Sequence, residues 1–277
     1  MKELKEKLRV VILCAGEGTR IREINSNLPK SMIQIQSMDN KPLLNIIIDD
    51  LLNQGLNNIV IILGFMGKVI ESYISSLKNQ SPILYNRIIT LNAHPDYIKG
   101  PLFTFLTILD YPNISKKENN FLVFPGDTLF DHVLLNDVLM VLMKEIENFQ
   151  GKPIIFYKRV KVSDINKKTH LISRVKTIKK RNIEIITRIE EIKVPNISEK
   201  TYIDQIIPIF FLNYEFLLLI SQILKSSHSN KISDILNEVC KRNLQEVIAC
   251  EITSKGSFYD IDTIFDLDYL NKKKSGQ

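Results

Sequence analysis

Cysteine is scarce in this chain. Its three cysteines, Cys14, Cys240 and Cys250, lie far apart, and none belongs to a Cys-x-x-Cys pair. A disulfide framework is therefore excluded, and we expect buried thiols in a protein of a reducing compartment. Cys14 lies in an apolar segment directly before a glycine-containing loop, so we expect it to pack rather than to act as a nucleophile.

The sequence also lacks a secretory leader and a long uninterrupted apolar run. The start of the chain does not have the pattern of a secretory signal peptide, so none is expected. The longest candidate for a membrane span, residues 206–224, contains Pro208 and Asn213. It divides into a predicted strand over residues 206–212 and a predicted helix over residues 214–224. We therefore expect a cytoplasmic protein with no stable membrane insertion.

Charge of one sign is not concentrated in any arm of the chain. The formal net charge is +6, but the lysines are spread along the sequence, with the densest basic group at residues 176–181. Aromatic residues do not alternate with the basic ones, so no nucleic-acid partner is expected. With 277 residues, 44% of them hydrophobic, and no internal repeat, the sequence predicts a single domain over residues 1–277.

The most informative stretch is residues 10–32. Residues 10–14 are apolar and β-branched, which predicts a strand buried on both faces of a parallel sheet. Gly16 and Gly18 follow, and their missing Cβ atoms let backbone amides approach an anion closely. Arg20 adds a planar fork of donors and Lys30 a compact ammonium. Two cations and a run of amides predict a site for a polyanion.

Two common phosphate-binding motifs do not fit this stretch. A Walker loop requires Gly-Lys-Ser/Thr after its second glycine, where this chain has Gly18-Thr19-Arg20. A dinucleotide-binding fingerprint requires a third glycine, where this chain has Ile21. The loop is therefore expected to hold phosphates in some other way.

The order of apolar segments predicts an α/β protein. Helices are predicted over residues 41–54, 68–77, 102–109 and 134–149, and strands over residues 31–36, 58–63, 83–90, 121–125 and 153–157. This β-α-β-α-β order is typical of a doubly wound, mostly parallel, Rossmann-like sheet, in which ligands bind beyond the carboxyl ends of the strands. The shorter alternating runs of residues 158–205 predict a small antiparallel subregion.

Three aspartates form the predicted metal site. Asp127 follows Gly126 at the end of a predicted strand, where a carboxylate can hold a hard divalent cation. Alternation places Asp260 and Asp262 on one face of a short predicted strand, so both can address the same cation. Mg²⁺ is the cofactor expected for a triphosphate ligand.

The pattern Leu-x-Ala-Gly-x-Gly-Thr-Arg, followed by Pro-Lys-x-Met, resembles the signature of the nucleotidyltransferases that make NDP-sugars and CDP-alcohols. This resemblance implies that Arg20 and the loop hold the triphosphate and that Lys30 contacts the phosphates during the reaction. The residues that this assigns to the nucleotide-binding loop are Ala15, Gly16, Glu17, Gly18 and Thr19.

The same resemblance assigns roles further along the chain. Gly100 corresponds to a glycine that walls the nucleotide base, although Pro101 and Phe103 replace small polar residues of the family. Residues 158–205 correspond to the part that receives the acceptor. Within them, Glu191 and Lys193 loosely match an Ile-x-Glu-Lys-Pro stretch and are candidate acceptor contacts, with solvated edge charges as the alternative.

These residues predict a Mg²⁺-dependent nucleotidyltransferase that joins an NTP to a phosphorylated acceptor and releases pyrophosphate. No histidine or cysteine is placed as a nucleophile, and direct attack of a phosphate oxygen on the α-phosphorus needs only positioning and charge neutralisation. The family sequence Leu-x-Pro-Leu-Thr after the arginine is replaced by Ile-Arg-Glu-Ile-Asn. A phospho-alcohol such as phosphocholine or inositol phosphate is therefore open beside a sugar 1-phosphate.

Two alternatives are kept: a catalytically silent nucleotide-binding regulatory subunit, and a glycosyltransferase that uses an NDP-sugar. The first has no need of the metal carboxylates, and the second normally carries its Asp-x-Asp pair near the middle of the chain. The partners expected are the NTP, the phosphorylated acceptor and, in a homo-oligomer, further copies of the chain.

Overall fold

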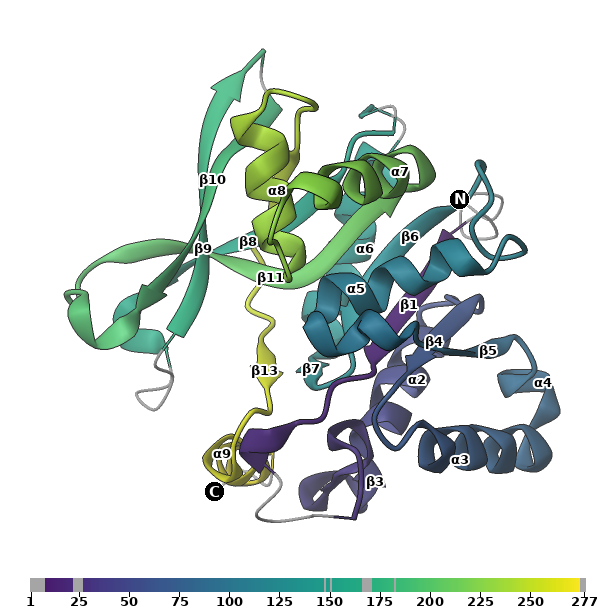
Figure 1. Ribbon diagram of the computed structural model, residues 1–277. Helices are drawn as coiled ribbons and strands as arrows, with labels where there is room; N and C mark the ends of the chain where they lie inside the picture. The colour runs from purple at the N-terminus through teal and green to yellow at the C-terminus, as the bar shows by residue number, and fades with distance from the viewer. Residues whose placement is uncertain are drawn as a thin grey trace.

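The computed structural model describes residues 8–21, 27–146, 148–149, 151–165, 171–181 and 183–274, and a nine-stranded sheet runs through it (Figure 1). The order of strands across the sheet is β5-β4-β1-β6-β11-β8-β12-β10-β9. Their bounds are β1 Leu8–Cys14, β4 Ile59–Leu63, β5 Ile88–Asn92, β6 Asn120–Pro125, β8 Ile154–Lys161, β9 Leu171–Lys180, β10 Ile183–Lys193, β11 Tyr202–Asn213 and β12 Ile248–Glu251.

The first half of this sheet has the predicted doubly wound arrangement. Strands β5, β4, β1 and β6 are all parallel, and their carboxyl ends meet at one edge. Beyond β6 the sheet is mixed, because β11 runs antiparallel to both β6 and β8 while β12 runs parallel to β8. The long β9–β10 hairpin is the predicted antiparallel subregion, and β9 also pairs with β11. The fold class predicted from the sequence is confirmed for this α/β arrangement.

Helices cover both faces of the sheet. Their bounds are α2 Leu43–Asn53, α3 Gly67–Gln80, α4 Pro82–Tyr85, α5 Pro101–Leu106, α6 His132–Glu145, α7 Tyr214–Ile223, α8 Ile232–Lys241 and α9 Ile264–Lys274. One hydrophobic core lies between the sheet and α2, α3 and α6, and a second lies between the opposite face and α5, α7 and α8. Within the described residues, none of these helices has the length and apolarity needed to cross a membrane.

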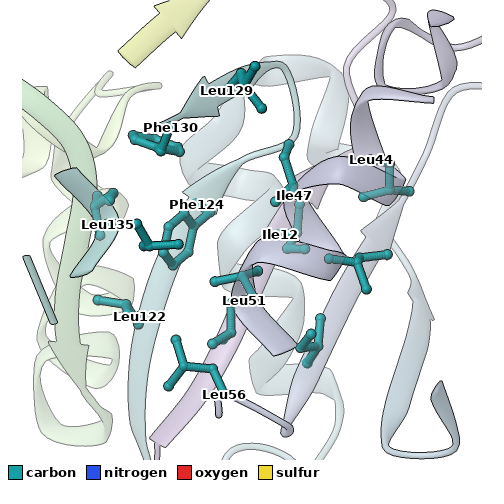
Figure 2. Packing of buried hydrophobic residues seen from close by; sticks show 14 of the residues in the cluster. Ile12, Leu44, Ile47, Leu51, Leu56, Leu122, Phe124, Leu129, Phe130 and Leu135 are labelled. Atoms are coloured by element: carbon teal, nitrogen blue, oxygen red, sulfur yellow. The ribbon is translucent and has the colours of Figure 1, made fainter. Parts of the chain in front are cut away.

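The alternation of strand residues explains the two cores. In β1, Ile12 belongs to the first core and Val11 to the second, and both are fully buried. Figure 2 shows the first core, where Ile47 and Leu51 of α2 pack near Ile12 and near Phe124 of β6. Each such side chain removed from water contributes roughly 1.5–3 kcal/mol. These cores hold the carboxyl ends of the parallel strands in place.

The C-terminal segment returns to that edge of the sheet. Strand β13, Phe258–Asp260, pairs antiparallel with β7, Thr128–Phe130, and the register places Asp260 opposite Thr128. Helix α9 follows, and Asn271 accepts hydrogen bonds from the backbone and side chain of Ser37, each 3.2 Å long. Figure 1 shows this yellow segment running beside the purple N-terminal one. Asp260 and Asp262 are thus brought close to Asp127, which follows β6.

Several predicted boundaries are wrong. The strand predicted over residues 83–90 begins only at Ile88, because Pro82 fixes the φ angle for a helical turn, α4, ahead of it. The helix predicted to residue 149 is α6, which ends at Glu145. The strand predicted over residues 31–36 is reduced to the two residues of β2, Gln34–Ile35, with a 3₁₀ turn on each side. Strand β2 pairs with β3, Lys41–Pro42.

Two further predictions concern the site itself. Strand β13 ends at Asp260, so Asp262 lies in the loop beyond it and not on the same strand face. The residues Arg22 and Glu23, where the chain departs from the family sequence, lie outside the described residues.

Candidate active site

The phosphate-binding loop follows β1 and has two glycines with different surroundings. Gly18 has a φ of +61°, and a Cβ there would lie 2.9 Å from Cβ of Lys30. Nothing lies within 4 Å of a Cβ placed on Gly16. Gly18 is therefore required by the backbone and by the packing of Lys30, whereas Gly16 leaves an open space that a ligand can enter.

A cavity of about 780 Å³ lies over this loop. Its volume is within the range of small-molecule sites in proteins. Ten residues predicted for the site line it, namely Ala15, Gly16, Glu17, Gly18, Thr19, Arg20, Lys30, Gly100, Asp127 and Asp262. Asp260 does not line the cavity, but it lies beside two residues that do.

The three predicted metal ligands converge. Asp127, Asp260 and Asp262 each offer a carboxylate oxygen, and these oxygens lie within 4.8 Å of one another. The Thr128 hydroxyl donates to Asp260 at 3.3 Å. Partial removal from water, followed by repulsion from Asp127 and Asp262, raises the pKa of Asp260 to about 7, although the residue is exposed in part. Three oxygen donors of this kind fit the ligand preference of Mg²⁺.

Two cations neutralise these carboxylates. The Lys30 ammonium lies 2.7 Å from Oδ2 of Asp127 and 2.7 Å from Oδ1 of Asp262, and its side chain is only 9% exposed. The Arg20 guanidinium lies 2.8 Å from Oδ2 of Asp262 and is 71% exposed. Burial alone lowers the pKa of Lys30, but the neighbouring carboxylates outweigh burial and raise it above its ordinary value. Lys30 is therefore a charged ammonium inside the site.

Asp131 holds the C-terminal segment against α6. Its carboxylate accepts from the backbone N–H of Leu134 at 3.0 Å, which caps α6, and from the N–H of Ser257 at 2.6 Å. A Cβ on Gly256 would lie 2.4 Å from the Leu134 nitrogen, so glycine is required for this close approach. Asp131 is therefore a positioning residue for β13.

Sequence reasoning missed the wall of the cavity that comes from other elements. The missed lining residues with polar or large side chains are Ser31, Tyr97, Ile98, Thr104, Asn230 and Lys231. Ser31 is a buried residue of this wall, and its hydroxyl faces the Cys14 thiol. Such a buried polar atom at a cavity wall is a natural contact for a polar ligand.

Asn230 and Lys231 lie directly before α8, where the backbone of Asn230 contacts the start of α5. The carbonyl of Asn230 accepts from the backbone N–H of Leu102 at 3.1 Å. Gly100 has a φ of +140°, and a Cβ on it would lie 2.6 Å from that same carbonyl oxygen. The glycine at position 100 was thus the one sign in the sequence that another segment packs closely there. The residues around Gly100 do not indicate that this segment contains Asn230.

The two candidate acceptor contacts lie on β10 and are exposed. Glu191 accepts a hydrogen bond from the Lys231 ammonium, and Lys231 lines the cavity. Glu191 is thus adjacent to the cavity wall without being part of it. Lys193 lies two residues further along the strand and does not line the cavity.

The arrangement lacks a reactive nucleophile in the described lining. Cys14 is the one thiol there, and burial raises its pKa to about 12, so it is a neutral thiol near pH 7. No histidine lies among the described lining residues. What the cavity offers is an open glycine loop, two cations and a carboxylate cluster, which can bind a polyanion and a divalent cation together.

The chain is similar to known proteins in sequence and in fold. A family model described as nucleotidyl transferase matches residues 9–267. The UTP–glucose-1-phosphate uridylyltransferase of Haloferax volcanii is 28% identical over 124 residues, which are 45% of this chain and 45% of that protein. The choline-phosphate cytidylyltransferase of Streptococcus pneumoniae is 39% identical over 59 residues, which are 21% of this chain and 24% of that protein. The match thus spans less than half the length of these curated relatives.

The fold is similar over nearly the whole chain. The crystal structure of a UDP-glucose pyrophosphorylase with UDP-glucose matches with a TM-score of 0.68 and 19% identity, over 97% of this chain and 98% of that one. This likeness confirms the fold that the sequence predicts.

Proposed function

The chain belongs to the nucleotidyl transferase family, and we propose that it is a Mg²⁺-dependent nucleotidyltransferase that joins an NTP to a phosphorylated acceptor and releases pyrophosphate. The observation that carries this proposal is the meeting of three parts in one cavity. These parts are the open loop at Gly16, the buried Lys30 ammonium and the carboxylates of Asp127, Asp260 and Asp262.

The chain's own groups supply most of the proposed chemistry. The loop amides and the Arg20 guanidinium bind the triphosphate, and the Lys30 ammonium neutralises charge that develops on the phosphates. Asp127, Asp260 and Asp262 would hold the Mg²⁺, which when bound supplies further neutralisation of the phosphate oxygens.

The reaction is an in-line displacement at the α-phosphorus. An oxygen of the acceptor's phosphate forms a bond to that phosphorus, and the bond to the oxygen between the α- and β-phosphates breaks, so that pyrophosphate leaves. The acceptor phosphate is ionised near pH 7, and no general base is required. This accounts for a cavity that holds neither a histidine nor an ionised thiol among its described lining residues.

We assign the base to the side of the cavity formed by Gly100, Tyr97 and Ile98. Tyr97 and Ile98 belong to the 3₁₀ turn Pro95–Lys99, Gly100 directly precedes α5, and all three residues line the cavity. The backbone there offers polar groups for a base edge, while Ile98 offers an apolar surface.

The acceptor is a sugar 1-phosphate or a phospho-alcohol, the two classes that the names of the matched relatives contain. We assign its binding to the antiparallel insertion at residues 158–205 within a single nucleotidyltransferase domain over residues 1–277. Glu191 accepts a hydrogen bond from Lys231, which lines the cavity, and Lys193 lies two residues further along the same strand. Both are proposed to contact the acceptor when the hairpin engages it.

The two alternative functions are less well supported. A silent regulatory subunit gains nothing from a lysine held 2.7 Å from two carboxylates of a cluster that can bind metal. A glycosyltransferase would use an NDP-sugar and release an NDP rather than pyrophosphate, so product analysis separates it from the main proposal.

The test is pyrophosphate release with Mg²⁺ from each of the four NTPs, paired with glucose 1-phosphate, phosphocholine and inositol 1-phosphate. Release is expected to require one NTP and one acceptor, and to fall by about 10³-fold or more in Asp127→Asn, as for the loss of a charge-stabilising group. The matched control is Asp39→Asn, an exposed site with a φ of 56° that asparagine tolerates. Silence with every pair, with NTP binding intact, would contradict the proposal.

Two further properties are proposed with the function. The enzyme acts in the cytoplasm, where the three unpaired thiols stay reduced. Self-association into a homo-oligomer is expected, and light scattering after size exclusion tests it.

A further inference from the structure

We propose, on the basis of the function proposed above, that the Lys30 ammonium is the counter-ion of the carboxylate cluster before a divalent cation binds. When the cation binds to the carboxylates, the Lys30 ammonium moves to the triphosphate. Lys30 and the metal then compete for the same oxygens. The site becomes one in which metal and nucleotide each assist the binding of the other.

The proposal rests on the ion pairs of the Asp262 carboxylate. Its Oδ1 lies 2.7 Å from the Lys30 ammonium and its Oδ2 lies 2.8 Å from the Arg20 guanidinium, so both oxygens already have a cation. The Lys30 ammonium also takes Oδ2 of Asp127 at 2.7 Å. A Mg²⁺ ion needs ligand oxygens at about 2.0–2.1 Å in near-octahedral geometry, which these contacts oppose.

Burial restricts where Lys30 can go. Its side chain is 9% exposed, so the ammonium cannot exchange its carboxylates for bulk water at low cost. The Lys30 ammonium therefore needs an anionic partner both before and after a metal binds. The carboxylates provide that anion in the metal-free protein, and the triphosphate provides it once a metal has taken the carboxylates.

The path for this exchange is short. A Cβ on Gly18 would lie 2.9 Å from Cβ and 3.3 Å from Cδ of Lys30, so the lysine stem runs directly along the phosphate-binding loop. Rotation about the last bonds of the stem can turn the ammonium from the carboxylates toward the cavity, which Lys30 and Gly18 both line.

Charge also favours the exchange. Two side-chain cations face three carboxylates in the metal-free cluster, and a dication entering there repels an ammonium a few ångströms away. A triphosphate brings negative charge that accepts both Lys30 and Arg20. Metal alone must therefore displace Lys30 without compensation, whereas metal with nucleotide does not, and the coupling is reciprocal.

The experiment measures Mn²⁺ binding without nucleotide, with free Mn²⁺ followed by electron paramagnetic resonance. Lys30→Met is expected to bind Mn²⁺ about tenfold more tightly than the native protein, since removing one partner of a buried pair leaves the other charge uncompensated. Its thermal midpoint in EDTA should fall, and Mn²⁺ should raise it by more than in the native protein. Lys41→Met, which removes the exposed partner of Asp49 at 3.3 Å, is the matched control and should change neither.

Equal or weaker Mn²⁺ binding by Lys30→Met overturns the proposal, and so does failure of both proteins to bind Mn²⁺. If Lys30→Met does not fold in EDTA, Arg20→Met decides, because Arg20 is 71% exposed and its ion pair within the described residues is with Asp262. A smaller gain in Mn²⁺ affinity, of about twofold to fivefold, is expected there, since exposed ion pairs are weaker, and no gain overturns the proposal. Turnover by the native protein is measured separately, so this result and the fate of the proposed function are distinguishable.

Discussion

The two glycines of the phosphate-binding loop are predicted to fail in different ways when each is changed to alanine. Gly18→Ala places a Cβ on a residue with a φ of +61°, only 2.9 Å from Cβ of Lys30. Gly16→Ala places a Cβ where nothing lies within 4 Å and where φ is not positive. Gly18→Ala should therefore destabilise the folded protein, whereas Gly16→Ala should leave the fold intact and weaken only the binding of the ligand.

The magnitude follows from the backbone. The left-handed conformation costs a residue with a Cβ roughly 1–2 kcal/mol, and the contact with Lys30 adds to it because the atom met is close to the backbone and not at a flexible end. Gly18→Ala should therefore lower the free energy of unfolding by about 2 kcal/mol. Gly16→Ala should leave the free energy of unfolding within about 0.5 kcal/mol of the native value.

The assays are urea denaturation and NTP binding by isothermal titration. Gly16→Ala should weaken NTP binding by about tenfold, because its methyl group occupies the space that a phosphate needs beside the loop amides. Native stability in Gly18→Ala would contradict the left-handed backbone and close packing at Gly18. Native NTP affinity in a stable Gly16→Ala would refute the assignment of this loop as the phosphate-binding loop.

Three other predictions test separate parts of the site. Gly100→Ala, with a φ of +140° and a Cβ that would lie 2.6 Å from the Asn230 carbonyl, should cost about 1–3 kcal/mol in urea denaturation, and native stability would contradict that contact. Asp131→Ala should cost about 1–2 kcal/mol through loss of the α6 cap and should also weaken Mn²⁺ binding, because β13 loses its anchor; unchanged Mn²⁺ affinity would oppose the positioning role. The raised pKa of Asp260, about 7, means that protons compete with metal below pH 7, so Mn²⁺ affinity should fall by about fivefold from pH 7 to pH 6 and level off above pH 8. Because the folded-state pKa is raised, metal-free stability should decrease as pH rises from about 4 to 7, and Asp260→Asn should remove that slope.

Much of the site could be predicted because its main parts are local in the sequence. An apolar β-branched run followed by two glycines predicts both the buried strand β1 and the loop after it, and the structure has both. The carboxylate at Asp127 follows from the same logic, since it stands at the end of an apolar strand. In each case the residues that determine the conformation are neighbours of the functional residue.

What could not be predicted depends on contacts between distant segments. Asn230 and Lys231 reach the cavity only because the segment before α8 packs against the start of α5, more than a hundred residues earlier. Asp262 lies close to Asp127 and Asp260, as the sequence predicts, but it lies on a different element, because the length of β13 is set by its pairing with β7 and not by its own sequence. The helical turn at Pro82 was missed because the apolar residues after it suit a strand equally well.

The most direct test of the proposed reaction follows the α-phosphorus. Each NTP carrying ³²P at the α position is incubated with Mg²⁺ and the acceptor that supports pyrophosphate release, and the products are separated. The label should appear in a nucleotide joined to the acceptor, with unlabelled pyrophosphate released, and this transfer should be lost in Asp127→Asn and kept in Asp39→Asn. Label found only in free nucleoside mono- or diphosphate, or transfer unchanged in Asp127→Asn, would contradict nucleotidyl transfer at this site.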